Sequence, residues 1–380
     1  MSKTYKNKIK KKTKKAVEKA LKKSAFLRVV AIILILAVIA GCAYYYFFIY
    51  KKKSPPPATG DLSFHFMMLG NEYAGDSIYV KAGDTDILID AGSRKDSVDD
   101  IKSYVDTYCT DGILEYVVAT HADQDHIAGF AGNNSIFHKY KCKTIIDFPI
   151  SEKKTATYDE YKQNRDAEVS GDGAVHYTAL ECYKEINGAK RVYTLAESIT
   201  MEILYHKYYE EDAYYENDYS VCLLFRHGAK SFLFTGDLEE DGEISLANNN
   251  DISNVDLYKA GHHGSNTSSH KDLLNEARPK ICVVSCVAGT DEYTDEIANQ
   301  FPMQNFINRI SKYTNKVYVT SIGDTEFTNG QKFAPLNGNV VVISDGENPV
   351  TVNCSNNNTL LKDTAWFKAK RTLPQYWAAA

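Results

Sequence analysis

Six consecutive residues, His121-Ala-Asp123-Gln-Asp125-His126, combine two imidazoles with two carboxylates. They follow the apolar run Tyr116–Ala119, which predicts a buried strand. Packing does not require four ionisable side chains within six residues, and a solvated charged loop would bring them together only by coincidence. A loop after a strand lets these side chains converge on a small volume, and divalent metals accept that mixture of nitrogen and oxygen donors. The segment therefore predicts a metal site.

Two further predicted strands end next to potential ligands. Gly236 and Asp237 follow the run Ser231–Thr235, and a histidine pair follows the run Val255–Lys259. A carboxylate at position 237 would reach the same sheet edge as the first segment, although Asp237 is also a possible N-cap for a helix beginning at Leu238. One histidine of the pair, His262 or His263, is expected to bind metal.

The elements around these segments alternate between short apolar runs, punctuated by Gly, Asn and Asp, and longer helical patterns. This alternation is typical of an α/β domain with layered sheets and helices. The expected helices are 97–108, 127–139, 177–186, 238–247, 269–276 and 295–311. Two strand-rich halves are joined by a polar, helix-leaning stretch over residues 151–190. No second domain boundary is indicated within residues 61–380.

The run His121–His126 resembles the HxHxDH motif of the metallo-β-lactamase superfamily. It is more similar to the hydrolase domain of the ComEC competence protein family, in which the second His is commonly Asp. The other blocks that carry the resemblance occur in order: Gly75-Asp-Ser-Ile78 with Ile87-Leu-Ile-Asp-Ala-Gly-Ser93, Asn217-Asp-Tyr-Ser220 with Phe232-Leu-Phe-Thr-Gly-Asp237, Lys259-Ala-Gly-His-His-Gly-Ser-Asn-Thr-Ser268, and Ser344-Asp-Gly346. The resemblance covers roughly Leu62 to Cys354 and implies a four-layer αββα sandwich.

The resemblance also implies roles for single residues. It assigns His121 and Asp123 to one metal, Asp125, His126 and His262 to the other, and Asp237 to a bridge between them. Asp125 and His263 are then the catalytic residues, with His263 as a proton donor or substrate contact. Asp90 is expected to support the ligand loop without touching metal, and a simple turn-forming role is its alternative.

One ligand of the family pattern, the usual third-motif His, is not evident in this sequence. The candidates for its place are His206, His176 and Asn217, and Asn217 is the one expected to support the site. Without that imidazole the first metal has an oxygen-rich ligand set, so manganese is as suitable as zinc. The expected cofactors are therefore two divalent ions, Zn²⁺ or Mn²⁺.

Two cations close together lower the pKa of a bridging water, supply hydroxide at neutral pH and stabilise the oxyanion formed on attack. The leading interpretation is a phosphodiesterase or nuclease. Hydrolysis of a lactone, lactam or ester is the alternative chemistry, and a non-catalytic binding module is the alternative class. Backbone amides of the segment 264–268 could hold a phosphate, although Ser268 is equally suited to cap a helix.

The N-terminal region predicts a membrane anchor. Residues 1–28 carry twelve Lys and Arg, residues 29–50 are uncharged and apolar, and residues 51–60 contain a proline-rich spacer. About 20 apolar residues cross a bilayer as a helix, and the basic flank predicts a cytoplasmic N-terminus with residues 61–380 outside the cytoplasm. Alternatively, Ile39-Ala-Gly-Cys42 resembles a lipobox, in which case the domain is a lipoprotein lipidated at Cys42.

Charge restricts the partners of the outer domain. The whole chain carries −5, but residues 1–53 hold fifteen bases and one acid, so the remainder has 29 bases against 48 acids, a charge of −19. This acidity disfavours stable binding of duplex nucleic acid and favours small or single-stranded anionic substrates. The eight cysteines form no CxxC pair and are expected to be mainly core residues.

Overall fold

The computed structural model describes residues 62–378 of the chain. The chain divides into two compact units, residues 1–56 and 57–380, and the described residues all belong to the second. The predicted basic tail, membrane segment, spacer and lipidation site at Cys42 lie outside the described residues. Within residues 62–378, no helix has the combination of length and apolar character that a membrane span requires.

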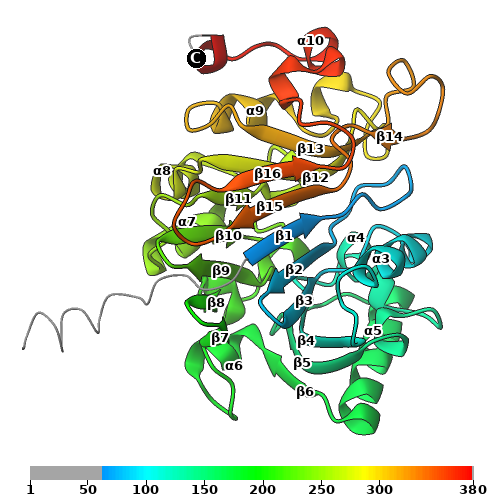
Figure 1. Ribbon diagram of the computed structural model, residues 1–380, viewed down its shortest axis with the longest axis vertical. Helices are drawn as coiled ribbons and strands as arrows, with labels where there is room; N and C mark the ends of the chain where they lie inside the picture. Colours follow the sequence, from blue (N-terminus) through cyan, green and yellow to red (C-terminus); the bar gives the residue numbers. More distant parts are fainter. Residues whose placement is uncertain (1–61, 379–380) are drawn as a thin grey trace, which may run out of the picture. The chain divides into compact units, whose positions relative to one another are not determined.

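The second unit contains two eight-stranded sheets (Figure 1). The first sheet has the order β16-β15-β1-β2-β3-β4-β5-β6. Its strands are β1 (Leu62–Phe66), β2 (Ile78–Ala82), β3 (Thr85–Ile89), β4 (Ile113–Val118), β5 (Lys141–Asp147), β6 (Val175–Thr178), β15 (Val340–Ser344) and β16 (Thr351–Cys354). Neighbouring strands from β3 to β6 are parallel, and the other neighbours are antiparallel.

The second sheet has the order β14-β13-β12-β11-β10-β9-β8-β7. Its strands are β7 (Val192–Ala196), β8 (Ile199–Leu204), β9 (Cys222–His227), β10 (Lys230–Phe234), β11 (Leu257–Lys259), β12 (Ile281–Ala288), β13 (Val317–Ile322) and β14 (Ala334–Pro335). Strands β10 to β13 pair in parallel. Each sheet therefore contains a parallel block whose strands end at a common edge.

The two sheets pack face to face through phenylalanines. Phe64 of β1 lies 5.2 Å from the Phe225 ring and 4.8 Å from the Phe232 ring, which belong to β9 and β10. Strands β9 and β10 are buried on both faces: one face packs against the first sheet, and the other belongs to a second core. This second core lies between the outer face of the second sheet and four helices. These helices are α7 (Glu240–Asn249), α8 (Lys271–Ala277), α9 (Gln304–Ile310) and α10 (Ala365–Lys370).

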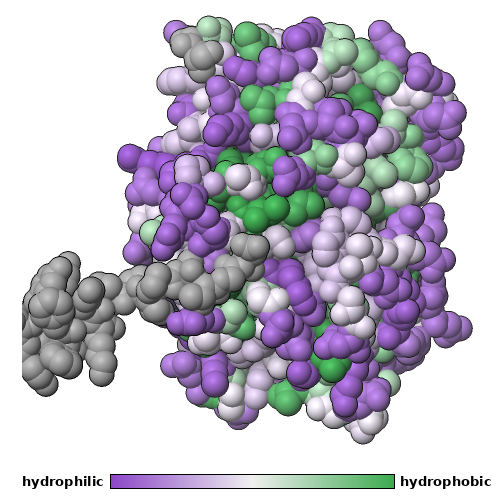
Figure 2. Space-filling model, viewed as in Figure 1, coloured by the Kyte–Doolittle hydropathy of each residue, from purple (hydrophilic) through white to green (hydrophobic). Residues whose placement is uncertain are grey.

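Helices flank both sheets, as Figure 1 shows. On the side of the first sheet lie α3 (Val98–Val105), α4 (Gln124–Ile127) and α5 (Ala156–Ala167), whereas α6 (Ala179–Lys184) packs near β8. The α/β sandwich architecture predicted from the sequence is therefore confirmed. In Figure 2 this face is largely hydrophilic, and hydrophobic residues gather where β15 and β16 lie, with Val341, Ile343 and Val352 only partly buried.

Three local predictions differ from the structure. Residues 127–139 form short turns instead of one helix, because Gly132 adopts a left-handed φ of 71° that ends helical geometry. The helix expected over 295–311 begins only at Gln304, because Pro302 lacks an N–H group and disfavours helix before it. The polar stretch 151–190 contains α5 and α6, but its segment 175–178 forms the edge strand β6, which overlaps the start of the helix expected over 177–186 and whose four residues are exposed or only partly buried.

Candidate metal centre

The candidate ligands come from loops that follow parallel strands of both sheets. His121, Asp125 and His126 lie in the loop and first turn after β4 of the first sheet, whereas Asp237 follows β10 and His263 follows β11 of the second sheet. The expectation that Asp237 and His121–His126 share one sheet edge is therefore wrong, although each loop lies beyond the carboxyl end of a parallel strand, where α/β sheets place their ligand sites. The fold thus delivers five ionisable side chains from three loops to one place.

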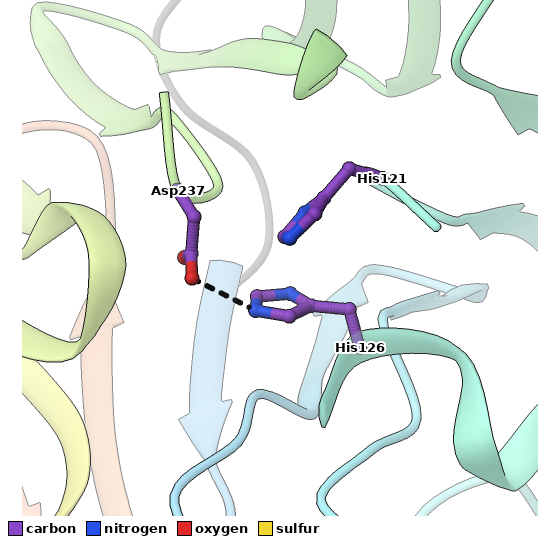
Figure 3. Close-up of side chains that lie close together, drawn as sticks. All are labelled: His121, His126 and Asp237. Atoms are coloured by element: carbon purple, nitrogen blue, oxygen red, sulfur yellow. Dashed lines mark hydrogen bonds and ion pairs between the residues drawn. The ribbon is translucent and has the colours of Figure 1, made fainter. Parts of the chain in front are cut away.

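His121, His126 and Asp237 form the first group of ligand atoms (Figure 3). Their donor atoms lie within 4.8 Å of one another, and all three residues are buried. Nε2 of His126 lies 3.1 Å from Oδ2 of Asp237, and the rings of His121 and His126 are 4.1 Å apart. Nε2 of His121 is buried and has no hydrogen-bond partner. A buried imidazole nitrogen without a hydrogen-bond partner requires an explanation. A role as a metal ligand would provide one.

Asp125, His126 and His263 form the second group. Nε2 of His263 lies 3.3 Å from Oδ2 of Asp125 and 3.4 Å from Oδ2 of Asp237. The same Asp237 oxygen therefore faces His126 of the first group and His263 of the second. This is the position that a carboxylate bridging two cations would occupy.

Hydrogen bonds behind the rings orient the imidazoles. Nδ1 of His126 lies 2.7 Å from Oδ2 of Asp90, and Nδ1 of His263 lies 2.9 Å from the carbonyl oxygen of Ser285. A proton held on Nδ1 leaves the lone pair on Nε2, which faces the cluster in both cases. Asp90 is itself fixed by Thr120, whose N–H and hydroxyl both donate to it at 2.7 Å. Asp90 therefore lies where the sequence expected a supporting residue.

Lys259 occupies the opposite side of Asp237. Its buried ammonium group lies 3.2 Å from Oδ1 of Asp237, forms an ion pair with Asp76 and donates to the carbonyl oxygen of Gly236 at 3.0 Å. Asp237 therefore presents one oxygen to Lys259 and the other to the histidines. Asp237 does not cap α7, because Glu239 holds the position before that helix.

The carboxylates of the cluster favour positive charge on the neighbouring imidazoles. Burial opposes a charged imidazole at His126, but Asp237 and Asp90 together raise its pKa well above the ordinary value. Burial has the same opposing effect at His263, where Asp237 and Asp125 raise the pKa to about 9. The pKa of His121 falls well below its usual range because it is buried beside His126. The His121 ring is thus neutral, whereas the neighbouring carboxylates keep the His126 and His263 rings protonated.

Two predicted ligands lie apart from these groups. Within residues 62–378, neither Asp123 nor His262 belongs to a group of three ligand atoms within 4.8 Å of one another. Asp123 forms an ion pair with Lys153, and its Oδ2 lies 3.9 Å from Nε2 of His121. Nδ1 of His262 turns toward Thr267 Oγ1 at 2.8 Å. Between the paired histidines, the structure brings His263 rather than His262 to the cluster.

The candidates for the third-motif ligand occupy three different places. Asn217 Nδ2 donates to Glu239 at 3.0 Å and lies 3.4 Å from Nδ1 of His262, at the rim of the site. His206 is buried and interacts with the carbonyl oxygen of Ser220. His176 pairs with Asp147 on β5 at 2.7 Å. Only Asn217 therefore lies next to a predicted site residue.

The backbone is strained where the site residues sit. Asp90, His262 and His263 have φ values of 58°, 44° and 53°, in the left-handed region that non-glycine residues rarely occupy. Such conformations persist where the surrounding structure enforces them and cluster at functional sites. Residue types alone do not predict these conformations, and the two adjacent histidines contact different groups: His262 contacts Thr267, and His263 contacts Ser285.

Sequence reasoning missed Thr120, Lys259, Asp76 and Tyr293 as parts of the site. Lys259 ends a predicted strand and opens a block that carries the family resemblance, but the sequence analysis assigns it no role, although a lysine in an apolar run is a signal of a buried charge partner. Tyr293 lies 168 residues from Asp125 in sequence, and its hydroxyl donates to Oδ2 of Asp125 at 3.2 Å. Local sequence patterns do not predict a contact between residues so far apart in the sequence.

The residues present fit a metal centre. Imidazole and carboxylate donors are the mixture that Zn²⁺ and Mn²⁺ accept, and the bare Nε2 of His121 supplies a donor without another function. The described residues therefore contain candidate metal-binding groups at the predicted position.

No family model matches the chain. Two curated proteins are similar in sequence. ComE operon protein 3 of Bacillus subtilis is 30% identical over 174 residues, which are 45% of this chain and 20% of that protein. Recombination protein 2 of Haemophilus influenzae is 24% identical over 211 residues, 55% of this chain and 21% of that protein. The chain thus spans about a fifth of the length of these relatives.

Solved structures with similar architecture include the metallo-β-lactamase fold protein YhfI from Bacillus subtilis, with 12% identity, a TM-score of 0.41, and coverage of 68% of this chain and 96% of that one. Human tRNase Z, short form, has 14% identity and a TM-score of 0.34, and the match covers 59% and 92% of the two chains. The resemblance to ComEC proteins that the motifs indicate is confirmed by the two sequence relatives.

Proposed function

We propose that the chain is a metal-dependent hydrolase that cleaves phosphodiester bonds in small or single-stranded anionic substrates. The observation that carries this proposal is the convergence of His121, Asp125, His126, Asp237 and His263 from three loops, with Nε2 of His121 bare. Two Zn²⁺ or Mn²⁺ ions bound there would supply Lewis acidity and lower the pKa of a coordinated water.

The proposed ligands divide into two sets around Asp237. His121, His126 and Asp237 would hold one ion, and Asp125 and His263 the other, with Oδ2 of Asp237 shared. Asp123 would complete the first set by leaving its ion pair with Lys153, since its Oδ2 is already 3.9 Å from His121. The ligand proposed from the histidine pair is thus His263.

The remaining residues would bind and protonate the substrate. The His262 side chain is 24% exposed and lies 3.8 Å from Glu239 at the rim of the site, and burial lowers the pKa of its imidazole below the ordinary value, which makes the protonated ring a stronger acid. A partly exposed imidazole with a carboxylate neighbour suits donation to a leaving oxygen. We assign to Asp125 the acceptance of the proton from the attacking water. His262 takes the proton-donor role that the sequence analysis assigned to His263.

The relatives support the choice of a phosphodiester over an acyl bond. One sequence relative is named as a recombination protein, and one structural neighbour is named as a tRNase. By analogy with these names, we assign to this chain the cleavage of phosphodiester bonds of the kind found in nucleic acids. The acidity of residues 54–380 limits the substrates to short or single-stranded ones.

A matched substrate screen tests this proposal. Full-length protein is loaded with Mn²⁺ or Zn²⁺ and assayed with bis(p-nitrophenyl) phosphate, a single-stranded oligonucleotide, a duplex of the same sequence, and lactone and p-nitrophenyl ester reporters. We expect hydrolysis of the phosphodiester and the single strand, with the duplex slower. Preferential ester or lactone cleavage would replace the proposal with an acyl hydrolase, and metal binding without any hydrolysis would replace it with a binding module.

We further propose that the domain lies outside the cytoplasm, held by the apolar segment 29–50 or by a lipid on Cys42. Protease added to intact cells stripped of their wall should digest the domain and spare an N-terminal tag. Protection of the whole chain would reverse the proposed topology. If the anchor is a lipid on Cys42, Cys42→Ser should lengthen the mature chain, because residues 1–41 then stay attached; if the apolar segment is the anchor, the chain length should not change.

A further inference from the structure

Tyr293 reaches the metal centre from a loop that no motif covers. It lies between β12 and α9, and its hydroxyl donates to Oδ2 of Asp125 at 3.2 Å. Nε2 of His263 lies 3.3 Å from the same oxygen. Two side chains therefore meet at one oxygen of a proposed ligand, and one of them is not itself a ligand of the kind that Zn²⁺ or Mn²⁺ prefers.

The loop is built to keep Tyr293 in place. The neighbouring Glu292 forms a 2.7 Å ion pair with Arg94, and its other oxygen accepts the N–H of Ala74 at 2.7 Å. At the other end, Arg371 donates to the carbonyl oxygens of Gln300 and Pro302 at 2.7 and 3.1 Å. Both stems are thus fixed to other parts of the domain, which restrains the position of the phenol.

An aromatic wall accompanies the hydroxyl. The Phe301 ring lies 5.4 Å from the Tyr293 ring and 5.8 Å from the His263 ring. The two aromatic rings form one wall beside the charged groups, and the Tyr293 side chain, at 56% exposed, faces the open side from which a substrate would enter. A donor in this position is suited to stabilising developing negative charge.

We propose that the Tyr293 hydroxyl donates a hydrogen bond to a non-bridging oxygen of the substrate at the metal centre. A cation held by Asp125 and His263 would make Oδ2 of Asp125 a weaker acceptor, so that the hydroxyl could donate to a substrate oxygen instead. A substrate oxygen beside Asp125 then lies within reach of the phenol. The inference rests on the proposed function for the identity of the substrate, but the binding of an oxyanion at this position does not require turnover.

The test compares Tyr293→Phe with Tyr376→Phe in full-length protein loaded with Mn²⁺. Both tyrosines are 56% exposed, and Tyr376 lies in α11 (Gln375–Ala378), away from the site. Metal content is measured by elemental analysis, inorganic phosphate binding by calorimetry, and kcat and KM with bis(p-nitrophenyl) phosphate. Tyr293→Gln, which restores a donor, serves as the conservative rescue.

We expect Tyr293→Phe to keep its metal, to bind phosphate about 3- to 10-fold more weakly, and to lose kcat by about 100-fold, the scale of one oxyanion donor. Tyr376→Phe should match the wild type, and Tyr293→Gln should recover part of the loss. Unchanged phosphate affinity, or metal loss equal to the loss of affinity, would overturn the inference. If the wild type binds phosphate through Tyr293 but cleaves no phosphodiester, the proposed function fails and the Tyr293 inference stands.

Discussion

Oδ2 of Asp90 lies 2.7 Å from Nδ1 of His126, and this contact turns Nε2 of His126 toward Asp237. The contact of Asp90 with Nδ1 thus fixes the direction in which Nε2 of His126 points. His126 belongs to both groups of ligand atoms, so the orientation of this single ring affects the whole centre.

Replacing Asp90 by Asn should therefore weaken metal binding about 10- to 100-fold, the usual cost of losing a residue that orients a ligand. The fold should persist, because Asn tolerates the left-handed φ of 58° at this position. Competition with a chelator measures the affinity, and the exposed Asp345→Asn is the control. Equal affinities in the two variants would show that Asp90 does not position His126.

Lys259→Met should destabilise the metal-free protein by roughly 3–5 kcal/mol, because the change leaves the buried carboxylates of Asp76 and Asp237 without their cation. Added Mn²⁺ should recover part of this loss by supplying charge to Asp237. Thermal unfolding of both proteins with and without Mn²⁺ measures both effects. A variant as stable as the wild type without metal would mean that these carboxylates are compensated elsewhere.

Gly92→Ala should abolish metal binding although no ligand changes. A Cβ at this position would lie 2.1 Å from the carbonyl oxygen of Asp125, and backbone atoms cannot yield as a flexible side chain can. Gly171→Ala is the matched control, because nothing lies within 4 Å of its Cβ position. Elemental analysis and circular dichroism compare the two variants. Normal metal content in Gly92→Ala would contradict the packing of the ligand loop against this turn.

His206 should contribute to loss of stability in acid. Burial lowers its pKa to about 4 from an ordinary value of 6.5, so the unfolded chain binds a proton before the folded one does. The free energy of unfolding is unaffected by this titration above about pH 6.5. It falls by on the order of 3 kcal/mol in total as the pH decreases toward 4. His206→Gln should flatten this part of the stability curve, measured by urea unfolding from pH 7.5 to 4.5. An unaltered slope would mean that His206 titrates alike in both states.

The ligand loops could be predicted because each follows an apolar strand, but the strands before His121 and Asp237 belong to different sheets, so the single sheet edge expected from the sequence is wrong. This reasoning placed His121, His126 and Asp237 near one another. It could not choose between His262 and His263, because the choice depends on two consecutive left-handed residues that no propensity favours. Lys259 and Tyr293 were missed because their roles arise from contacts between distant strands and loops.

The central claim is that a two-cation centre is built around Asp237, whose oxygens face Lys259 on one side and His126 and His263 on the other. Metal content after loading and dialysis, measured on wild type and Asp237→Asn with turnover on the same samples, tests it most directly. The account predicts close to two ions per wild-type chain, and in the variant a loss of metal with turnover down by at least about 100-fold and an unchanged fold. A wild type without metal after loading, or a variant with normal metal and normal turnover, would contradict it.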